Sequence, residues 1–401
     1  MKITIKTLHG MTFKRTICAG LTIVLISLSS HSQSLKERDY FRSPLDIPLY
    51  LSGNFGELRS THFHAGLDFK TQAAVGKSVY AVADGYVSRI KIQSGGYGRA
   101  IYVSHPNGLT TVYAHLLSYN ETVESFVKEY QYRNQTFEVD LYLKKNQLTL
   151  SKGEILGLSG NSGSSSGPHL HFEIRKTASQ RPVNGLLYNF DVRDNIKPSI
   201  RGIAIYPMDE NSLVNGKNKK VILNATGSNG KYALSTRSPI AVSGITGFGI
   251  EVYDYLNGSS NRCGIYSIEM LIDSVRVYLH EVNEIGFDEA GYVKSHVDYA
   301  EKMASGRKFQ KMQLDPNNKL RFYATSPNKR YYRFSDNQKH HVHFNVKDSY
   351  GNLSTVDFFI LASDQKAPKI KNTSKQGVFM SWQKENFFEN EQVRVYLPKN
   401  A

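Results

Sequence analysis

The stretch Gly167-Pro168-His169-Leu170-His171-Phe172-Glu173-Ile174 decides the fold of the first half of the chain. From His169 onward, polar and apolar residues alternate strictly, which is the pattern of a half-buried β-strand. Side chains two apart on a strand share a face, so His169 and His171 project together while the apolar residues face a core. The pattern therefore predicts a strand that directs two imidazoles into one cleft.

Two upstream stretches contain further side chains that can bind a metal. Thr61-His62-Phe63-His64-Ala65-Gly66-Leu67-Asp68-Phe69 supplies His64 and Asp68, and Val112-Tyr113-Ala114-His115-Leu116 supplies His115. Imidazole and carboxylate are usual nitrogen and oxygen ligands of zinc. The candidate metal-site residues are therefore spread over three separated segments.

These segments resemble the lysostaphin/LytM-type zinc metallopeptidases, which cut peptide bonds in peptidoglycan. The family pattern H-x-G-x-D, Tyr-Ala-His-Leu and H-x-H appears in order as His64-Ala65-Gly66-Leu67-Asp68, Tyr113-Ala114-His115-Leu116 and His169-Leu170-His171. Flanking stretches also agree: Ala83-Asp84-Gly85-Tyr86-Val87, Gly95-Gly96-Tyr97-Gly98 and Lys152-Gly153-Glu154-Ile155-Leu156-Gly157. The resemblance covers about residues 45 to 190, which is under half of the chain.

The resemblance implies a role for each motif residue. His64, Asp68 and His171 are expected to bind one zinc ion per chain, with an open position for water. His115 and His169 are expected to be catalytic imidazoles that transfer a proton and stabilise the oxyanion as an amide carbonyl is attacked.

Other polar residues near the motifs receive different interpretations. Gly66 and Asp68 place the motif on His64, so we interpret His62 as a groove residue. Glu173 shares the face of the two motif histidines and is expected to orient a ligand. Asn54 and Arg59 precede the site, where they are candidates for substrate contact. Structural roles are expected for the remaining histidines considered: His105, His340, His341 and His343.

The resemblance implies a compact antiparallel β-sheet metallopeptidase domain with a groove over residues 33–195. Short β-rich runs between Val79 and Tyr113, separated by the turns Asp84-Gly85 and Pro106-Asn107-Gly108, are typical of an antiparallel meander. Residues 118–150 are interpreted as an insertion, helical at first, packed beside the groove.

The second half is predicted to be a β-sandwich over residues 197–365, of immunoglobulin-like type, so the chain as a whole is mainly all-β. Its predicted strands are Ile200 to Ile205, Phe248 to Tyr253, Ile265 to Ile272, Val275 to Leu279, His341 to Val346 and Val356 to Leu361. One helix is predicted from Glu289 to Met303, and residues 366–401 are predicted to be an extended C-terminal segment. No motif residue lies in this half, so we expect residues 33–195 to fold and cleave small substrates alone.

The first residues resemble a targeting segment. Positive residues precede the short apolar run from Cys18 to Leu28, and small residues around Ser32 suit signal cleavage. The run is shorter than the ~20 residues that span a bilayer, although an uncleaved anchor is the alternative. We expect residues 1–32 to be a signal peptide, the protein to be exported to the periplasm or cell envelope, and no later segment to span a membrane.

The composition of the chain limits the classes of molecule that the protein is expected to bind. The formal net charge is +15, but lysine and arginine are dispersed and no nucleic-acid-binding module is recognisable. Only Cys18 and Cys263 are present, so no disulfide is expected after signal removal. The Gly/Ser-rich stretch from Gly157 to Gly167 lacks the lysine of a phosphate-binding loop and is interpreted as a groove wall. The expected partner is peptidoglycan, with other envelope proteins as candidates for the β-sandwich.

The sequence thus predicts an exported zinc-dependent endopeptidase that hydrolyses peptide cross-links or stems of peptidoglycan. Two alternatives stay open. The chain is a catalytically silent or autoinhibited activator of other cell-wall hydrolases, or it is a peptidoglycan-binding scaffold in which the sandwich carries the function.

Overall fold

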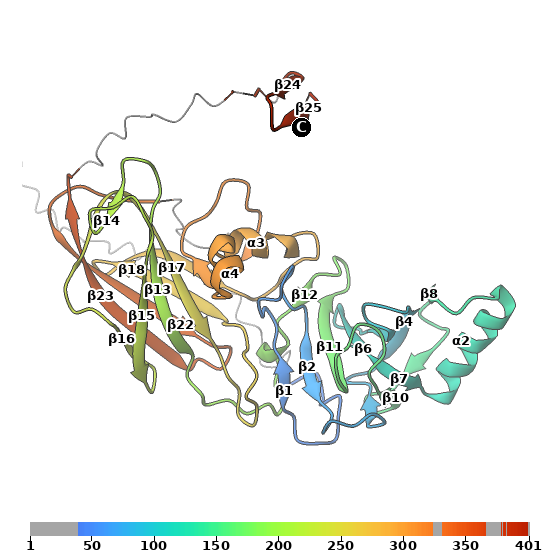
Figure 1. Ribbon diagram of the computed structural model, residues 1–401. Coiled ribbons are helices and arrows are strands. Elements are labelled where there is room, and N and C mark those ends of the chain that lie inside the picture. Colours follow the sequence, from blue (N-terminus) through green and yellow to red (C-terminus); the bar gives the residue numbers. More distant parts are fainter. Residues whose placement is uncertain (1–38, 324–330, 366–377, 379, 382, 400–401) are drawn as a thin grey trace, which may run out of the picture.

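The computed structural model describes residues 39–323, 331–365, 378, 380–381 and 383–399. The predicted signal peptide lies outside these residues. The molecule consists mainly of strands, as predicted, and the two halves of the chain form separate sheets that lie side by side (Figure 1). Within the described residues, no helix has the length and apolar character required to cross a bilayer.

The first half forms a large antiparallel sheet and a smaller one. The large sheet has the strand order β1 (Leu51–Gly53), β2 (Leu67–Lys70), β11 (His169–Lys176), β6 (Leu109–Ala114), β5 (Arg99–Ser104), β4 (Gly85–Ile92) and β8 (Val139–Tyr142), with β12 (Pro182–Val183) on β11 and β9 (Thr149–Leu150) on β4. The smaller sheet has the order β3 (Ser78–Tyr80), β10 (Ile155–Ser159) and β7 (Leu116–Tyr119). The predicted meander is confirmed as β4, β5 and β6, which pair antiparallel.

Strand β11 lies between β2 and β6, and its alternation is as predicted. Leu170, Phe172 and Ile174 are fully buried in the core, so the polar side chains of the strand lie on the opposite face. In the antiparallel register, His171 is paired with Asp68 of β2. Directly paired residues share a face of the sheet, so this register brings the HxH and HxGxD motifs together.

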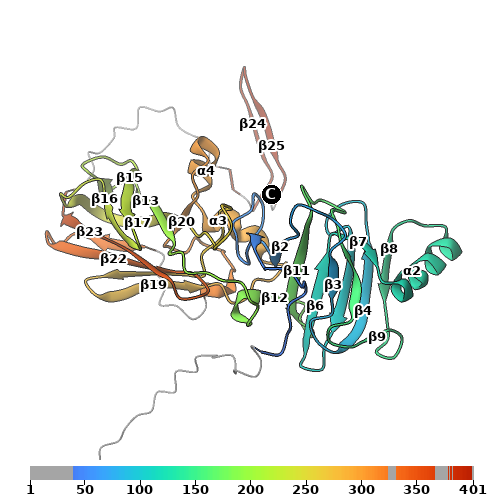
Figure 2. The ribbon, with the colours of Figure 1, turned by 90° about the horizontal axis from the view of Figure 1, so that it is seen from below.

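A helix occupies part of the segment predicted as an insertion. Helix α2 (Glu121–Asn134) begins where the Asn120 side chain accepts a hydrogen bond from the Val123 amide, a usual N-cap. Its buried residues Val123 and Val127 belong to the core of the first half, and α2 contacts β7. The helix lies at the end of the molecule remote from the second half (Figure 2).

The second half forms a sheet that closes through one long strand. The 3₁₀ turn η1 (Gly185–Leu187) is the last element of the first half. The elements of the second half include, in chain order, β13 (Ser199–Pro207), β14 (Leu213–Val214), β15 (Val221–Ser228), β16 (Lys231–Leu234), β17 (Ile240–Tyr253), β18 (Ser267–Ile272), β19 (Val275–Glu281), β20 (Phe309–Lys311), η3 (Arg321–Tyr323), β21 (Tyr332–Phe334), β22 (Lys339–Lys347) and β23 (Leu353–Ser363). Strand β17 pairs antiparallel with β13 and, near its start, parallel with β23. The pairings β17-β13-β15-β16-β23 therefore return to β17. The immunoglobulin-like topology stays a prediction.

The single helix predicted from Glu289 to Met303 is wrong. This segment contains a 3₁₀ turn η2 (Ala290–Tyr292) and two short helices, α3 (Val293–His296) and α4 (Tyr299–Ser305). Val297 is extended and buried between them, and Asp298 caps α4 by accepting from the Glu301 amide. Burial of Val297 and the local preference of aspartate for the N-cap outweigh the helical pattern of the sequence.

The two halves share a tight interface. Asn54 makes two hydrogen bonds with the backbone of Gly264, through Nδ2 at 2.9 Å and Oδ1 at 2.7 Å. The Phe63 ring packs against the rings of His296 and Phe322. Residues of both halves belong to one connected cluster of buried apolar side chains. Helices α3 and α4 lie between the two sheets (Figure 1). Near the C-terminus, strands β24 (Asn386–Glu389) and β25 (Arg394–Leu397) pair as a hairpin.

Candidate functional site

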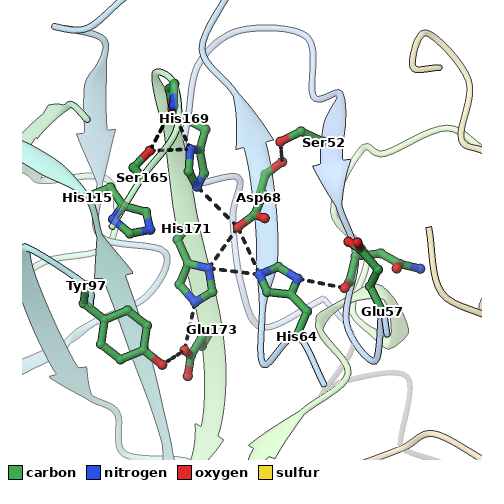
Figure 3. Close-up of polar contacts among 12 residues, drawn as sticks. Ser52, Glu57, His64, Asp68, Tyr97, His115, Ser165, His169, His171 and Glu173 are labelled. Carbon is green, nitrogen blue, oxygen red and sulfur yellow. Dashed lines mark hydrogen bonds and ion pairs between the residues drawn. The ribbon is translucent and has the colours of Figure 1, made fainter. Parts of the chain in front are cut away.

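Neighbouring elements of the large sheet bring the five predicted site residues together. Asp68 comes from β2, His169 and His171 from β11, and His64 from the segment before β2. His115 lies between β6 and β7 with a φ of 59°, an uncommon left-handed conformation that often marks functional positions. Figure 3 shows the five side chains around one point.

Three of these residues direct ligand atoms at one another. His64 Nε2 lies 3.1 Å from Asp68 Oδ1 and 3.2 Å from His171 Nδ1. His171 Nδ1 lies 2.9 Å from the same carboxylate oxygen. All three side chains are buried. Two imidazole nitrogens and one carboxylate oxygen that converge in this way are a ligand set typical of a catalytic zinc site.

The outer nitrogens of both imidazoles are fixed by acceptors. His64 Nδ1 lies 2.8 Å from the Asn54 carbonyl oxygen, and His171 Nε2 lies 2.8 Å from Glu173 Oε1. Since carbonyl and carboxylate oxygens only accept, these outer nitrogens carry an N–H. A metal ion would bind the neutral imidazoles through the inner nitrogens, His64 Nε2 and His171 Nδ1, which here contact the Asp68 carboxylate. Such outer anchoring is characteristic of metal-binding histidines, so the residues present fit a metal ion.

The other two imidazoles lie beside this group and are anchored in the same way. His115 Nδ1 donates to the Ser162 carbonyl oxygen at 2.8 Å, and His169 Nδ1 donates to that of Gly167 at 2.8 Å. The two ring centroids are 4.8 Å apart. His169 Nε2 lies 3.5 Å from Asp68 Oδ1, so this imidazole borders the ligand group without being part of it.

Steric contacts explain why the HxGxD motif contains a glycine. A Cβ atom on Gly66 would lie 2.4 Å from the backbone oxygen of Phe172 and 3.0 Å from the His171 ring. Any larger residue would therefore push the segment between His64 and Asp68 away from β11. The glycine permits the close approach that the ligand geometry requires.

Comparison with known protein families assigns this region. The model of peptidase family M23 matches residues 62–184. These residues form a peptidase M23 domain. The resemblance to lysostaphin/LytM-type peptidases that the three motifs predict is thereby confirmed for this part of the chain.

Curated relatives of the M23 domain carry peptidase names. A "DD-carboxypeptidase/endopeptidase Mpg" of Neisseria meningitidis serogroup B is 33% identical over 127 residues, which is 32% of this chain and 23% of the relative. A "Peptidoglycan DD-endopeptidase ShyA" of Vibrio cholerae is 29% identical over 168 residues, which is 40% of this chain and 32% of the relative. The chain thus spans a third or less of the length of these relatives.

A solved structure described as a zinc containing peptidase from Vibrio cholerae is 26% identical to the chain. The match covers 37% of this chain and 39% of that one, with a TM-score of 0.28.

An open groove of about 1170 Å³ runs across the M23 domain, and all five site residues line it. Residues Ser164 to Gly167 of the Gly/Ser-rich loop also line the groove, as do Pro168 and the exposed His62. The groove is not built by the M23 domain alone. The second half contributes a wall, named here the sandwich wall, made of these four residues: Asn261, Phe287, Ala290 and Gly291.

Burial and local charges together set the protonation of the site. Burial, and then the neighbouring imidazoles of His171 and His169, lower the pKa of His115 to about 4. Burial opposes ionisation of Asp68, but the charge of His64 and hydrogen bonds from the imidazoles hold its pKa well below the usual range. The carboxylate is therefore ionised and His115 is neutral at pH 7.

A buried charged group supports the M23 site from behind, and the sequence predicts it only in part. Glu173 was expected to orient a ligand, and its Oε1 accepts from His171. Arg175 Nε donates to Glu173 Oε2 at 2.6 Å, and the Tyr97 hydroxyl donates to Oε1. Burial would raise the pKa of Glu173, but Arg175 and His171 lower it to about 2. The continued alternation of polar residues along β11 was the signal that could have identified Arg175.

Other residues considered from the sequence occupy different places. Arg59 lines the groove and donates from Nη2 to Asp68 Oδ2 at 2.9 Å. Asn54, a candidate for substrate contact, instead directs its side chain to Gly264 in the second half. His105 bonds the Asp84 carbonyl oxygen and the Thr111 hydroxyl, away from the groove. The lining of the groove includes no residue of α2 among those that the structure describes.

The three histidines of β22 lie in the second half, outside the groove lining. His340 bonds Asp273 and Asp336, while His341 and His343 share Asp357. These contacts are polar pairs near the surface of the second half, with His340 on the opposite face of the strand from His341 and His343.

Proposed function

We propose that the protein is an exported zinc-dependent endopeptidase that hydrolyses peptide cross-links or stems of peptidoglycan. The observation that carries the proposal is the convergence of His64 Nε2, Asp68 Oδ1 and His171 Nδ1, with both outer imidazole N–H groups held by acceptors. These three atoms would hold the zinc ion. When bound there, zinc polarises the amide carbonyl and lowers the pKa of water toward ~7.

His115 and His169 are proposed to carry the proton transfers. Each holds its Nδ1 proton on a backbone carbonyl, so Nε2 is the nitrogen with a free lone pair. Such a nitrogen can accept a proton from the attacking water and return it to the leaving amine. Once protonated, an imidazolium at this position also stabilises negative charge on the former carbonyl oxygen.

The groove supports a peptide substrate with carboxylate groups. Besides Arg59, its lining includes Lys70 and Lys91, while Asp68 is the acidic residue of the lining. A cationic cleft attracts anionic ligands, and peptidoglycan stem peptides carry free carboxylates. The names of the relatives, which include DD-endopeptidase, agree with a D-alanyl–diaminopimelate cross-link as the bond of first choice.

One observation favours an autoinhibited form of the same enzyme as a second candidate. The sandwich wall comes from the other half of the chain and borders the groove. Phe287 is half-exposed there and lies over the Arg175 guanidinium at 4.7 Å. In this second candidate, the wall restricts access of long substrates until a partner displaces it.

The test combines metal content with product analysis. Purified protein should contain one zinc per chain and release cross-link fragments from defined sacculi, identified by mass spectrometry. His171→Ala should lose both zinc and activity. His115→Ala and His169→Ala should keep most of the zinc and lose most of the hydrolysis.

His62→Ala is the matched control, because His62 lines the groove and its ring bonds the Thr61 hydroxyl rather than a residue of the ligand group. It should keep zinc and a substantial share of the activity. A chain that binds zinc stoichiometrically but releases no fragments from any sacculus would support the silent-activator alternative and contradict the enzyme.

A further inference from the structure

Three aspartates that the peptidase chemistry does not use converge at one end of the second half. Asp194 lies in the segment between η1 and β13, Asp254 directly follows β17, and Asp348 directly follows β22. One carboxylate oxygen from each lies within 4.8 Å of the other two. None of the three lines the catalytic groove. Segments far apart in the sequence therefore bring three carboxylates to one point.

The cluster contains buried acceptor atoms that receive no hydrogen bond from a donor group. Asp254 is only 2% exposed, and its Oδ1 is buried without a hydrogen bond. Asp194 Oδ2 is also buried and receives no hydrogen bond from a donor group, although Asp194 and Asp348 lie close enough to share a proton. Among the residues that the structure describes, no lysine or arginine forms an ion pair with any of the three carboxylates. Buried carboxylates normally have donors or counter-ions, and their absence is costly.

The remaining oxygens are held in place by the surrounding backbone. Asp194 Oδ1 accepts from the Ile196 amide at 3.0 Å. Asp348 Oδ1 accepts from the amides of Tyr350 and Asn352, both at 2.9 Å, and Oδ2 accepts from Asn352 Nδ2 at 2.7 Å. These bonds fix the orientation of two carboxylates and leave the Asp254 oxygen directed at them.

We propose that Asp194, Asp254 and Asp348 bind one calcium ion where the segment leading from the M23 domain meets the second half. Calcium takes six to eight oxygen ligands at about 2.3–2.6 Å, from carboxylates, backbone carbonyls and water. Two oxygens on one such ion lie at most about 5 Å apart, which agrees with the spacing of the cluster. Zinc prefers nitrogen and sulfur ligands, so the imidazole site and the aspartate site select different metals.

The electrostatics of the cluster favour a cationic ligand. Burial, and then the charges of Asp194 and Asp348, raise the pKa of Asp254 to about 9. Burial is also the largest cause that raises the pKa of Asp194, to about 7. A bound divalent cation would favour the ionised form of all three groups. The competing account is that the carboxyl groups hold protons and bind no metal.

Calcium binding would tie three segments together. The segment containing Asp194 connects the M23 domain to β13, and the turn after Asp348 also contacts the first half, because Asn184 Nδ2 donates to Ser349 Oγ at 3.1 Å. The ion would therefore stabilise the placement of the second half, and with it the sandwich wall, relative to the groove. This consequence does not depend on the proposed peptidase activity.

The test uses the full chain freed of divalent cations. Equilibrium dialysis against radioactive calcium in the millimolar range should give one calcium per chain, and calcium should raise the thermal midpoint by about 3 °C or more. Asp254→Asn and Asp348→Asn should abolish both effects. His171→Ala should keep both, because the zinc ligands are separate, so failure of the proposed peptidase function would not affect this result.

Asp191→Asn is the matched control, since Asp191 lies in the same connecting segment but is exposed. It should keep calcium binding. The proposal is overturned if the wild-type chain takes up no calcium, or if Asp254→Asn takes up as much as the wild type. A chain that ignores calcium and is stabilised by Asp254→Asn would show instead that the cluster holds protons.

Discussion

At the scale of single residues, metal binding depends on the side chains that hold the ligands in place. The His171 imidazole can offer Nδ1 to a metal because Glu173 accepts the proton on Nε2. Arg175 in turn holds Glu173 in its ionised form. His171, Glu173 and Arg175 thus occupy alternate positions of β11. Arg175 keeps Glu173 ionised, and Glu173 fixes the position of the proton on His171.

Removing the charge of Glu173 should weaken metal binding without removing a ligand. We expect Glu173→Gln to lower zinc affinity by about 10–100-fold, as is typical when the outer partner of a metal-bound imidazole is replaced. Competition with a chromogenic chelator measures this affinity. Glu129→Gln, on the exposed face of α2, is the control and should leave it unchanged. Equal affinities in the wild type and Glu173→Gln would show that the buried acceptor does not tune the site.

The candidate ligands could be predicted from the sequence because each belongs to a short motif. The residues that support these ligands could be predicted only in part, through Glu173. Tyr97 and Arg59 reach the site from loops, and no periodicity indicates where a loop side chain will point. Asn54 was expected at the substrate, yet its side chain is used to join the two halves, a contact that depends on residues 210 positions away.

At the scale of elements, the most consequential segment is the one between β19 and β20. A single helix was predicted within it from Glu289 to Met303, but the segment forms a 3₁₀ turn and two short helices, and it carries Phe287, Ala290 and Gly291 to the groove. Strand boundaries were easier to predict, since alternation is a local property of the sequence. The partner of each short helix is a distant part of the chain, which local patterns do not encode.

The sandwich wall should contribute to substrate binding. Phe287→Ala removes a half-exposed ring from the groove, which we expect to cost about 1 kcal/mol of binding and raise KM about 5-fold with little change in kcat. Steady-state kinetics on a defined cross-linked muropeptide measure both constants. Phe359→Ala, an exposed ring on β23, is the control. A rise in kcat/KM after Phe287→Ala would instead support the autoinhibited candidate.

The buried histidine of α3 should make the second half sensitive to acid. His296 Nε2 donates to Gln310 Oε1 at 2.9 Å and Nδ1 accepts from the Tyr323 hydroxyl, an arrangement that requires the neutral imidazole. Burial is the main cause that lowers the pKa of His296 to about 4. Because the folded-state pKa lies below the unfolded value of ~6.5, the stability is fully present above about pH 6.5 and is lost as the pH falls toward 4.

Urea unfolding at a series of pH values tests this. Below about pH 6.5, the wild type should lose up to about 1.4 kcal/mol per pH unit more than His296→Gln, the contribution of one proton. Tyr323→Phe keeps the imidazole and removes its hydroxyl partner, so it should retain the steeper dependence. Identical slopes for wild type and His296→Gln would contradict the assignment.

At the scale of the whole molecule, the two halves are more closely joined than the sequence indicates. The motifs all lie in residues 33–195, from which an independent domain was expected. The structure places aromatic packing between Phe63 and Phe322, and an ion pair between Arg181 and Glu289, across the boundary. Asn54 makes both kinds of contact: its backbone carbonyl accepts from His64, and its side chain bonds Gly264 in the second half.

Truncation near Asn195 should therefore affect more than targeting. We expect the shortened chain to melt at a lower temperature, because its apolar face loses its cover, and to cleave soluble muropeptides and intact sacculi more slowly. Calorimetry and the two hydrolysis rates measure these effects. If only the rate on sacculi fell, the second half would serve for attachment alone and the shared groove would have no kinetic importance.

Cys263 gives the interface a chemical property of its own. Cys263 is 2% exposed and lines a small cavity together with Glu57 and Phe63 of the first half. Burial, and then the charge of Asp254, raise the pKa of this thiol, so the nucleophilic thiolate is scarce while the halves are in contact. Alkylation at this position would then proceed only as fast as the halves separate. The rate of alkylation at Cys263, measured by peptide mass mapping, would therefore report the rate at which the two halves separate. This measurement needs no introduced label.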